Sequence, residues 1–308
     1  MPEITLRREA RSVLWPILLI FVMFILATVF PAVKRLSRSV SPFTIAFYRY
    51  GFAILPLSPI FVVENRRRHV FRSGRDVLAM FGLGALGIAV FSTCLTIGLK
   101  MSTAYNGSLL INSQPIFTTL LAPLIIKEDF SLLRIIGALF GVSGVYFIVT
   151  GGPQGGFLTH EYFWGNLILL GGALSISIYS ILLKRYVIKY GGFVPTFLTM
   201  LGGTVLLLIA VVVFTANGLF RDITPGSWLL LIYIGVVGTA FVYPLFNLAL
   251  KAIGVVRAVG FKLLIPVFGI ALSVILLRER PGLFTYAGTA IVIASVYLIQ
   301  RTPVKTRR

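Results

Sequence analysis

The chain has 308 residues, of which 57% are hydrophobic and only 12% are charged, and its mean hydropathy is +0.96. An ordinary soluble domain has about 45–50% apolar and about 25% charged residues, so this composition excludes a soluble protein. The formal net charge of +19 is divided among short segments and forms no single basic stripe, which argues against a nucleic-acid-binding protein.

Apolar runs of about 20 residues, each long enough to cross about 30 Å of hydrocarbon as a helix, follow one another along the chain. They predict an all-α integral membrane protein with ten transmembrane helices. The first run follows three arginines, as in a signal peptide, but it is longer than a signal core and no small-residue cleavage site follows it, so we expect a retained helix. The predicted spans are 13–33, 42–63, 76–98, 103–126, 132–150, 162–183, 192–215, 226–249, 254–277 and 282–300.

The basic residues predict the orientation of these helices. With a cytoplasmic N-terminus, the inner segments hold 19 of the 28 lysines and arginines and the outer segments hold seven. Cytoplasmic loops carry an excess of Lys and Arg. The sequence therefore predicts that both termini lie in the cytoplasm, and the small size favours a cell (inner) membrane.

The fourth predicted helix carries polar residues on one face. Ser108, Asn112 and Pro115 share a face at helical spacing, and Tyr105 lies a turn earlier. Pro115 removes a helix hydrogen bond and frees the carbonyl four residues before it, so we expect a kink there. Glu128, at the membrane edge beside basic neighbours, is expected to stabilise the turn that follows.

A tandem repeat divides the chain into two units. The segment 82–149 aligns without a gap with 233–300, and a shift of 151 residues gives 14 identities in 68 positions. The predicted units are 1–150 and 157–308, and the uncharged Gly/Pro run 151–156 joins them. Because each unit has five helices, an odd number, the second must be inverted relative to the first. Inverted repeats of this kind are typical of transporters with a central site.

The second unit contains the most informative residue, Lys262. It lies about eight residues into the ninth helix, about 12 Å along the axis, and all nine acidic residues lie outside the span centres. A lysine at this depth costs at least about 2.5–3.5 kcal/mol on insertion scales. Three roles are open: it binds an anionic substrate group, it carries a coupling proton after desolvation, or it donates to backbone carbonyls. Pro266 frees the Lys262 carbonyl and pairs with Pro115 by symmetry.

Further polar pairs at helical spacing predict a wet interior around this lysine. Tyr243 and Asn247 lie four residues apart in the eighth helix, and Tyr179 lies in the sixth. Arg49, in the second helix about two turns from its outer end, either reaches outward or bonds helix carbonyls. The residues that we predict to contact substrate are Lys262, Asn112, Ser108, Tyr105, Tyr179, Tyr243 and Asn247, and we predict a kinking or gating role for Pro115 and Pro266.

Three segments resemble a known family. Residues 42–51 read PFTIAFYRYG, and both repeats carry a helix-four proline, a glutamate just past its end (Glu128 or Glu279) and a Gly-rich fifth helix. This pattern is similar to the EamA type of the drug/metabolite transporter superfamily, over nearly the whole chain. The resemblance implies ten helices in two inverted five-helix repeats and solute transport. Because the family signature includes Arg49 across varied substrates, it implies a structural role for Arg49. Glu128 and Glu279, beside basic neighbours at the membrane edge, are expected to stabilise the turns after the fourth and ninth helices.

We therefore expect a secondary transporter of a small anionic or zwitterionic metabolite, with amino acids or related carboxylates and export favoured. Coupling to protons or to a counter-substrate is open. The alternatives are uptake or exchange of an organophosphate or vitamin-like anion, and a membrane scaffold that transports nothing. A P-loop, an HExxH motif and an Asp-rich cluster are missing, and Cys94 is the single cysteine. We therefore expect no enzyme activity, no cofactor and no metal site.

Overall fold

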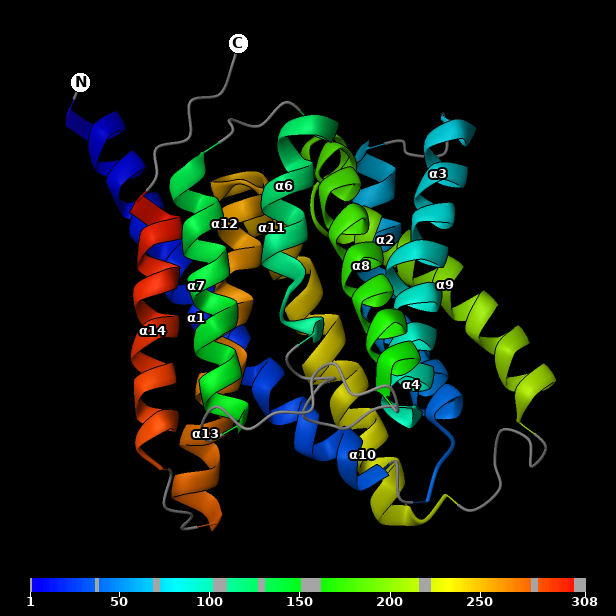
Figure 1. The fold of residues 1–308 in the computed structure, drawn as a ribbon. Helices are drawn as coiled ribbons and strands as arrows, with labels where there is room; N and C mark the ends of the chain where they lie inside the picture. Colours follow the sequence, from blue (N-terminus) through cyan, green and yellow to red (C-terminus); the bar gives the residue numbers. More distant parts are fainter. Residues whose placement is uncertain are drawn as a thin grey trace.

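The computed structural model describes residues 2–36, 39–68, 73–101, 110–126, 131–150, 162–215, 223–277 and 282–301, and the described chain is helical throughout, without strands. Ten helical stretches follow one another (Figure 1). In chain order they are α1 (Pro2–Leu36), α2 (Pro42–Arg68), α3–η2–α4 (Gly74–Gly84, Ala85–Val90, Phe91–Lys100), α6 (Gln114–Ile126), α7 (Leu132–Thr150), α8 (Phe163–Tyr190), α9 (Phe193–Phe214), α10–η4–α11 (Pro225–Gly235, Val236–Phe241, Val242–Ile253), α12–η5–α13 (Val255–Gly260, Phe261–Leu263, Leu264–Leu277) and α14 (Leu283–Arg301).

The length and composition of these helices suit a bilayer. Five described stretches are long and apolar enough to cross a membrane, and four shorter apolar helices accompany them. Large apolar side chains cover the outside of the bundle, for example Leu124, which is 79% exposed, and Val212, which is 70% exposed. A soluble protein of this size would bury such residues, whereas lipid tails solvate them.

The repeat found in the sequence recurs in the backbone. Shifting α3 by 151 residues gives α10, shifting α7 gives α14, and shifting the π-helical segment η2 gives η4, in each case with the same bounds. π-Helix is rare and usually a single-turn bulge. Its occurrence at equivalent positions in both units shows that the two units share their local irregularities as well as their helices.

The two units run in opposite directions. In Figure 1, α1 begins on the side of the bundle where α14 ends, so both described ends of the chain lie on one face, called here the termini face. Helix α1 runs away from this face and α8, which opens the second unit, runs toward it. The first helices of the two units are therefore antiparallel, which is the inversion that the odd helix number predicts.

Close packing joins the units through glycines. A Cβ added at Gly84 would lie 2.0 Å from the Thr199 carbonyl oxygen of α9, and one added at the equivalent Gly235 would lie 2.9 Å from the Arg49 carbonyl oxygen of α2. Between α7 and α14, the Ser295 hydroxyl donates to the Gly137 carbonyl over 2.6 Å. Small residues allow helices to approach closely where lipid gives no hydrophobic drive for association. These close contacts between the units are therefore possible because glycine has no side chain.

Candidate functional site

Two helices are interrupted at equivalent points near the middle of the bundle. Helix α6 begins at Gln114, after a turn at Asn112 and Ser113. In the second unit a 3₁₀ segment, η5, separates α12 from α13, with α12 in the upper part of Figure 1 and α13 below it. Subtracting 151 places η5 on residues 110–112, which overlap the first interruption at Asn112. Discontinuous helices at the repeat interface are the usual setting of transporter binding sites.

The prolines explain where these interruptions fall. Pro115 is the second residue of α6 and Pro266 the third residue of α13. Proline has no N–H to donate, so it is best tolerated in the first turn of a helix. The sequence predicts a kink at each proline, and the structure instead ends one helical segment and starts another. The gating role of both prolines stays a prediction.

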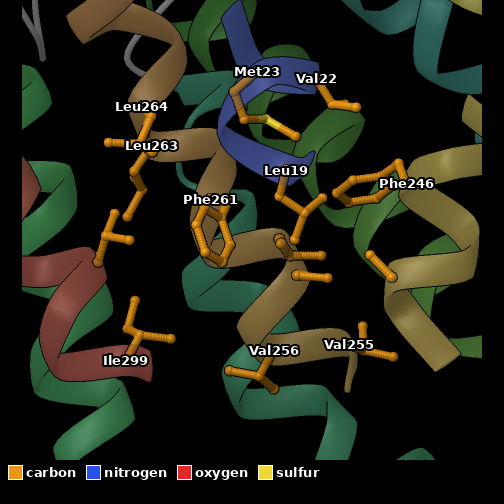
Figure 2. Packing of buried hydrophobic residues seen from close by; sticks show 14 of the residues in the cluster. Leu19, Val22, Met23, Phe246, Val255, Val256, Phe261, Leu263, Leu264 and Ile299 are labelled. Atoms are coloured by element: carbon orange, nitrogen blue, oxygen red, sulfur yellow. The ribbon is translucent and has the colours of Figure 1, made fainter. Parts of the chain in front are cut away.

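Lys262 is the middle residue of η5, and its two neighbours fix its direction. Phe261 and Leu263 are buried in the apolar cluster with Leu19 of α1 and Ile299 of α14 (Figure 2). A 3₁₀ helix has three residues per turn, so successive side chains point in three different directions. With its neighbours in the apolar cluster, Lys262 is left to face α6 and α11.

Two uncharged groups contact the ammonium of Lys262. Its Nζ donates to the Gln114 side-chain oxygen over 3.0 Å and lies 4.7 Å from the ring centre of Phe246. Of the acidic side chains that the structure describes, Asp76 pairs with Lys189 at the end of α8 and Glu64 lies near the end of α2. Hydrogen bonding to an amide and an aromatic face stabilises the charge without neutralising it. The site therefore presents a net positive group inside the bundle.

Sequence reasoning missed Gln114. It is buried at 3% exposure, and besides the bond from Lys262 its amide nitrogen donates to the Ser180 hydroxyl over 3.4 Å. Its backbone carbonyl accepts from the Ser177 hydroxyl over 3.2 Å. The signal was present, since a glutamine directly before the symmetric proline is a polar side chain in the middle of an apolar span. Gln114 lies off the face that Ser108, Asn112 and Pro115 share at helical spacing.

The predicted aromatic and amide residues of α8 and α11 bond to side chains of α2 and α9. The Tyr179 hydroxyl lies 3.1 Å from the Thr199 hydroxyl, and Asn247 donates to Thr196 over 2.7 Å. The hydroxyls of Tyr243 and Tyr50 lie 3.5 Å apart. Tyr243 and Asn247 share α11 with Phe246, the residue that contacts Lys262. Tyr243 and Asn247 thus lie on the helix that contacts Lys262, and Tyr179 lies on α8, whose Ser180 bonds Gln114.

The remaining predicted residues fall in several places. Asn112 is buried in the turn that interrupts the fourth helix. Tyr105, Ser108, Glu128 and Glu279 lie outside the described residues, so their roles stay predictions. So does the linker 151–156. Within the described ranges no group of His, Cys, Asp and Glu is arranged to hold a metal ion.

Arg49 contacts the π-helical segment of the second unit. Its Nε donates to the Thr239 hydroxyl over 2.9 Å, and Thr239 in turn donates to the Ile234 carbonyl five residues earlier over 2.7 Å. The sequence suggests that Arg49 reaches outward or bonds carbonyls, and in the structure it bonds a hydroxyl on η4. This contact ties α2 to the other unit, and the structural role of Arg49 stays a prediction.

Thr239→Val is expected to lower the free energy of unfolding by about 1–3 kcal/mol, because it leaves the half-buried Arg49 without this acceptor. The matched control is Thr118→Val, since the buried Thr118 hydroxyl has no hydrogen-bond partner in the described structure, and we expect no loss there. Thermal unfolding of the two purified variants measures the difference. Equal melting temperatures would contradict a structural role for the Arg49–Thr239 contact.

A separate charged cluster lies where α8 ends, on the termini face. The Lys189 ammonium lies 2.5 Å from an Asp76 carboxylate oxygen, and Tyr190 donates to the same oxygen. A cavity of about 260 Å³ lies here, lined by Asp76, Arg185, Tyr186 and Lys189. Lys189 is 58% exposed, so solvent screens the ion pair and it contributes little to stability. The cluster links α3 of the first unit to α8 of the second. It is separate from the Lys262 site.

Comparisons with known proteins agree with this architecture. The model of the EamA-like transporter family matches twice, over residues 13–150 and 163–301. The chain belongs to the EamA-like transporter family. The two matches, each covering one five-helix unit, confirm the predicted all-α membrane fold in two repeats. The family and the names of its members indicate a transporter of small molecules embedded in a membrane, not an enzyme.

Several proteins are similar to this family member over most of its length. An uncharacterized transporter of Bacillus subtilis, YdfC, is 29% identical over 275 residues, covering 88% of this chain and 85% of its own. An uncharacterized transporter of Archaeoglobus fulgidus is 27% identical and covers 92% of this chain and 96% of its own. A probable terminal-alkyne amino-acid exporter of Streptantibioticus cattleyicolor is 25% identical, covering 96% and 95%. One solved structure superposes with a TM-score of 0.77 at 17% identity, covering 91% of this chain and 94% of its own, which supports the fold.

Proposed function

We propose that this protein is a secondary transporter that moves a small anionic or zwitterionic metabolite, and that Lys262 binds the anionic group. The observation that carries the proposal is the ammonium of Lys262 at a helix interruption inside the bundle, with Gln114 and Phe246 as its described partners. A cation kept at this depth without an acidic partner is costly. Such a residue is a functional candidate because a purely structural role would favour an ion pair.

The anionic group is best placed beside the two helix interruptions. The first turns of α6 and α13 begin there, and the N-terminal N–H groups of a helix carry partial positive charge. Pro115 and Pro266 have no N–H, and the N–H groups of Ile116 and Leu264 already donate to the Ser113 and Lys262 carbonyls. A carboxylate or a phosphate at Lys262 would therefore be stabilised mainly by the ammonium. Tyr179, Tyr243 and Asn247 are proposed to line the same space.

Amino acids and related carboxylates are the favoured substrates, with export the favoured direction. The similar protein from Streptantibioticus cattleyicolor is named as an amino-acid exporter, which supports this choice. The antiparallel units, divided at the linker 151–156, support alternating access, in which one central site opens to each side in turn. We further propose the cell (inner) membrane as the location, with both termini cytoplasmic because basic residues concentrate on the termini face.

Flux measurements in liposomes test the proposal. Purified protein is reconstituted, and uptake of a labelled zwitterionic amino acid, of a carboxylate, of an organophosphate and of the corresponding decarboxylated amine is compared, with and without a pH gradient. We expect flux of compounds with an anionic group and none of the amine. Flux of the organophosphate alone would favour the phosphate alternative. Flux of the amine alone would contradict the proposed role of Lys262, and no flux of any compound would favour a scaffold.

A further inference from the structure

The amide of Gln114 has one orientation that satisfies its neighbours. The Ser180 hydroxyl donates its hydrogen to the Ile176 carbonyl over 2.8 Å, so its remaining capacity is to accept. The Gln114 nitrogen fills that capacity at 3.4 Å. The Gln114 oxygen must then face Lys262, whose ammonium has donors only. The donors and acceptors alone therefore fix this series of hydrogen bonds, in which Lys262 donates to Gln114, Gln114 to Ser180, and Ser180 to the Ile176 carbonyl.

Helix α8 also holds the backbone of this residue. The single hydrogen of the Ser177 hydroxyl is shared between the Ala173 carbonyl of its own helix, at 2.6 Å, and the Gln114 carbonyl, at 3.2 Å. Gln114 is 3% exposed, so its side chain has little room to take another rotamer. The ammonium of Lys262 is therefore held at a fixed place by a rigid acceptor, and binding geometry in such a site depends on this support.

The electrostatic consequence depends on the acceptor being neutral. A glutamine oxygen accepts a hydrogen bond from the ammonium and leaves its full positive charge, whereas a glutamate of nearly the same size would neutralise it. Only one of the three ammonium hydrogens is used by Gln114, and the Phe246 ring takes a second direction. The remaining donor capacity is free to meet an anion.

The repeat shows that this arrangement is not a by-product of symmetry. Lys262 corresponds to Ile111 in the first unit, and Gln114 corresponds to Ile265 in the second. Each unit thus supplies one polar member at an interruption and an isoleucine at the other position. The lysine and the glutamine come from different units and meet at their interface.

We propose that Gln114 is the positioning and charge-specificity residue of the Lys262 site, which orients the ammonium while leaving it charged for a carboxylate or phosphate group. This inference rests on the proposed function of Lys262 as the anion-binding residue. Gln114 acts through the lysine and does not itself contact the transported group.

Gln114→Glu tests the inference, because it preserves size and the contact with Lys262 but adds a negative charge. We expect the affinity for an anionic substrate to fall at least 100-fold, measured as the KM for flux in liposomes, with unchanged or higher thermal stability. A purely structural role predicts an unchanged KM, because the hydrogen bond persists. Gln114→Glu with wild-type KM for the anion would overturn the inference.

Gln114→Met is the second variant, since it keeps the volume and removes the acceptor without adding charge. We expect about a 10-fold higher KM for the anion and an unchanged preference for anions over amines. If Gln114→Glu fails to fold, this variant decides: an unchanged KM in its folded fraction contradicts the positioning role. Wild-type protein measured in parallel separates the two proposals. Absence of anion flux in the wild type contradicts the proposed function. Normal flux in both the wild type and the variants contradicts only the role of Gln114.

Discussion

Replacing Lys262 by methionine is expected to abolish transport of the anionic substrate while leaving the protein at least as stable as the wild type. Methionine is unbranched like lysine and one atom shorter, so it can still pack against Phe246, but it has no charge. A loss of 100-fold or more corresponds to about 2.8 kcal/mol, which is within the range of a charge-assisted hydrogen bond to a carboxylate together with its electrostatic attraction. Flux in liposomes and thermal unfolding in detergent measure the two effects on the same preparation.

The unchanged stability expected for Lys262→Met separates a binding role of Lys262 from a structural one. Removing a cation from the membrane interior recovers the cost of placing it there, about 2.5–3.5 kcal/mol on insertion scales, and loses one hydrogen bond to Gln114, worth about 1.5–3 kcal/mol for a charged donor. The two terms nearly cancel or leave a gain. Functional residues commonly show this pattern of lost activity without lost stability.

A conservative control completes this experiment. Lys262→Arg keeps the charge but replaces a compact ammonium with a planar fork that is longer, so we expect weakened transport with the same preference for anions. If Lys262→Met transports the anion at the wild-type rate, Lys262 does not bind the substrate. If it unfolds while Lys262→Arg stays folded, the lysine is a packing residue that donates to its surroundings.

The sequence predicts the architecture well because membrane helices carry strong local signals. Apolar run lengths give the bounds of most helices within a few residues. Helix α1 and the ends of α2 and α8 extend beyond the predicted spans. Of the predicted span 103–126 the structure describes residues 110–126, in which α6 begins only at Gln114. The odd number of helices per unit gives the inversion, which follows from topology alone. The shift of 151 residues even anticipates the matching bounds of α3 and α10 and of α7 and α14.

The candidate site is predicted less completely, because its geometry depends on contacts between distant segments. The absence of acids from the span centres identifies Lys262, but its partner Gln114 lies 148 residues earlier in the chain. No periodicity links positions in different helices. The π-helical segments η2 and η4 were not expected either, since their i→i+5 bonding has no residue pattern that distinguishes it from α-helix. The contact of Arg49 with Thr239 on η4 could for the same reason not be foreseen.

Gly84→Leu is expected to prevent stable folding, because this position is where the two units touch backbone to backbone. A Cβ at Gly84 would lie 2.0 Å from the Thr199 carbonyl oxygen and 2.8 Å from the Gly203 nitrogen, and neither atom belongs to a side chain that can move aside. Helix α9 would have to move away from α3. Overpacking in a core costs about 1–3 kcal/mol where side chains can adjust, so a backbone clash is expected to cost more.

Gly82→Leu is the matched control for this variant, two residues earlier in the same helix. A Cβ added at Gly82 meets no atom within 4 Å, so the two substitutions share their residue types and their helix but differ in what they face. We expect Gly82→Leu to purify as a monodisperse protein with wild-type melting temperature, and Gly84→Leu to aggregate or to melt more than 10 °C lower. Because Gly84 is equivalent to Gly235, whose added Cβ would lie 2.9 Å from the Arg49 carbonyl oxygen of α2, Gly235→Leu should show the same loss at the second inter-unit contact. Equal stability of the three variants would mean that the close approach of the units at these glycines does not hold the fold together, and the inverted arrangement would then depend mainly on the α7–α14 contact.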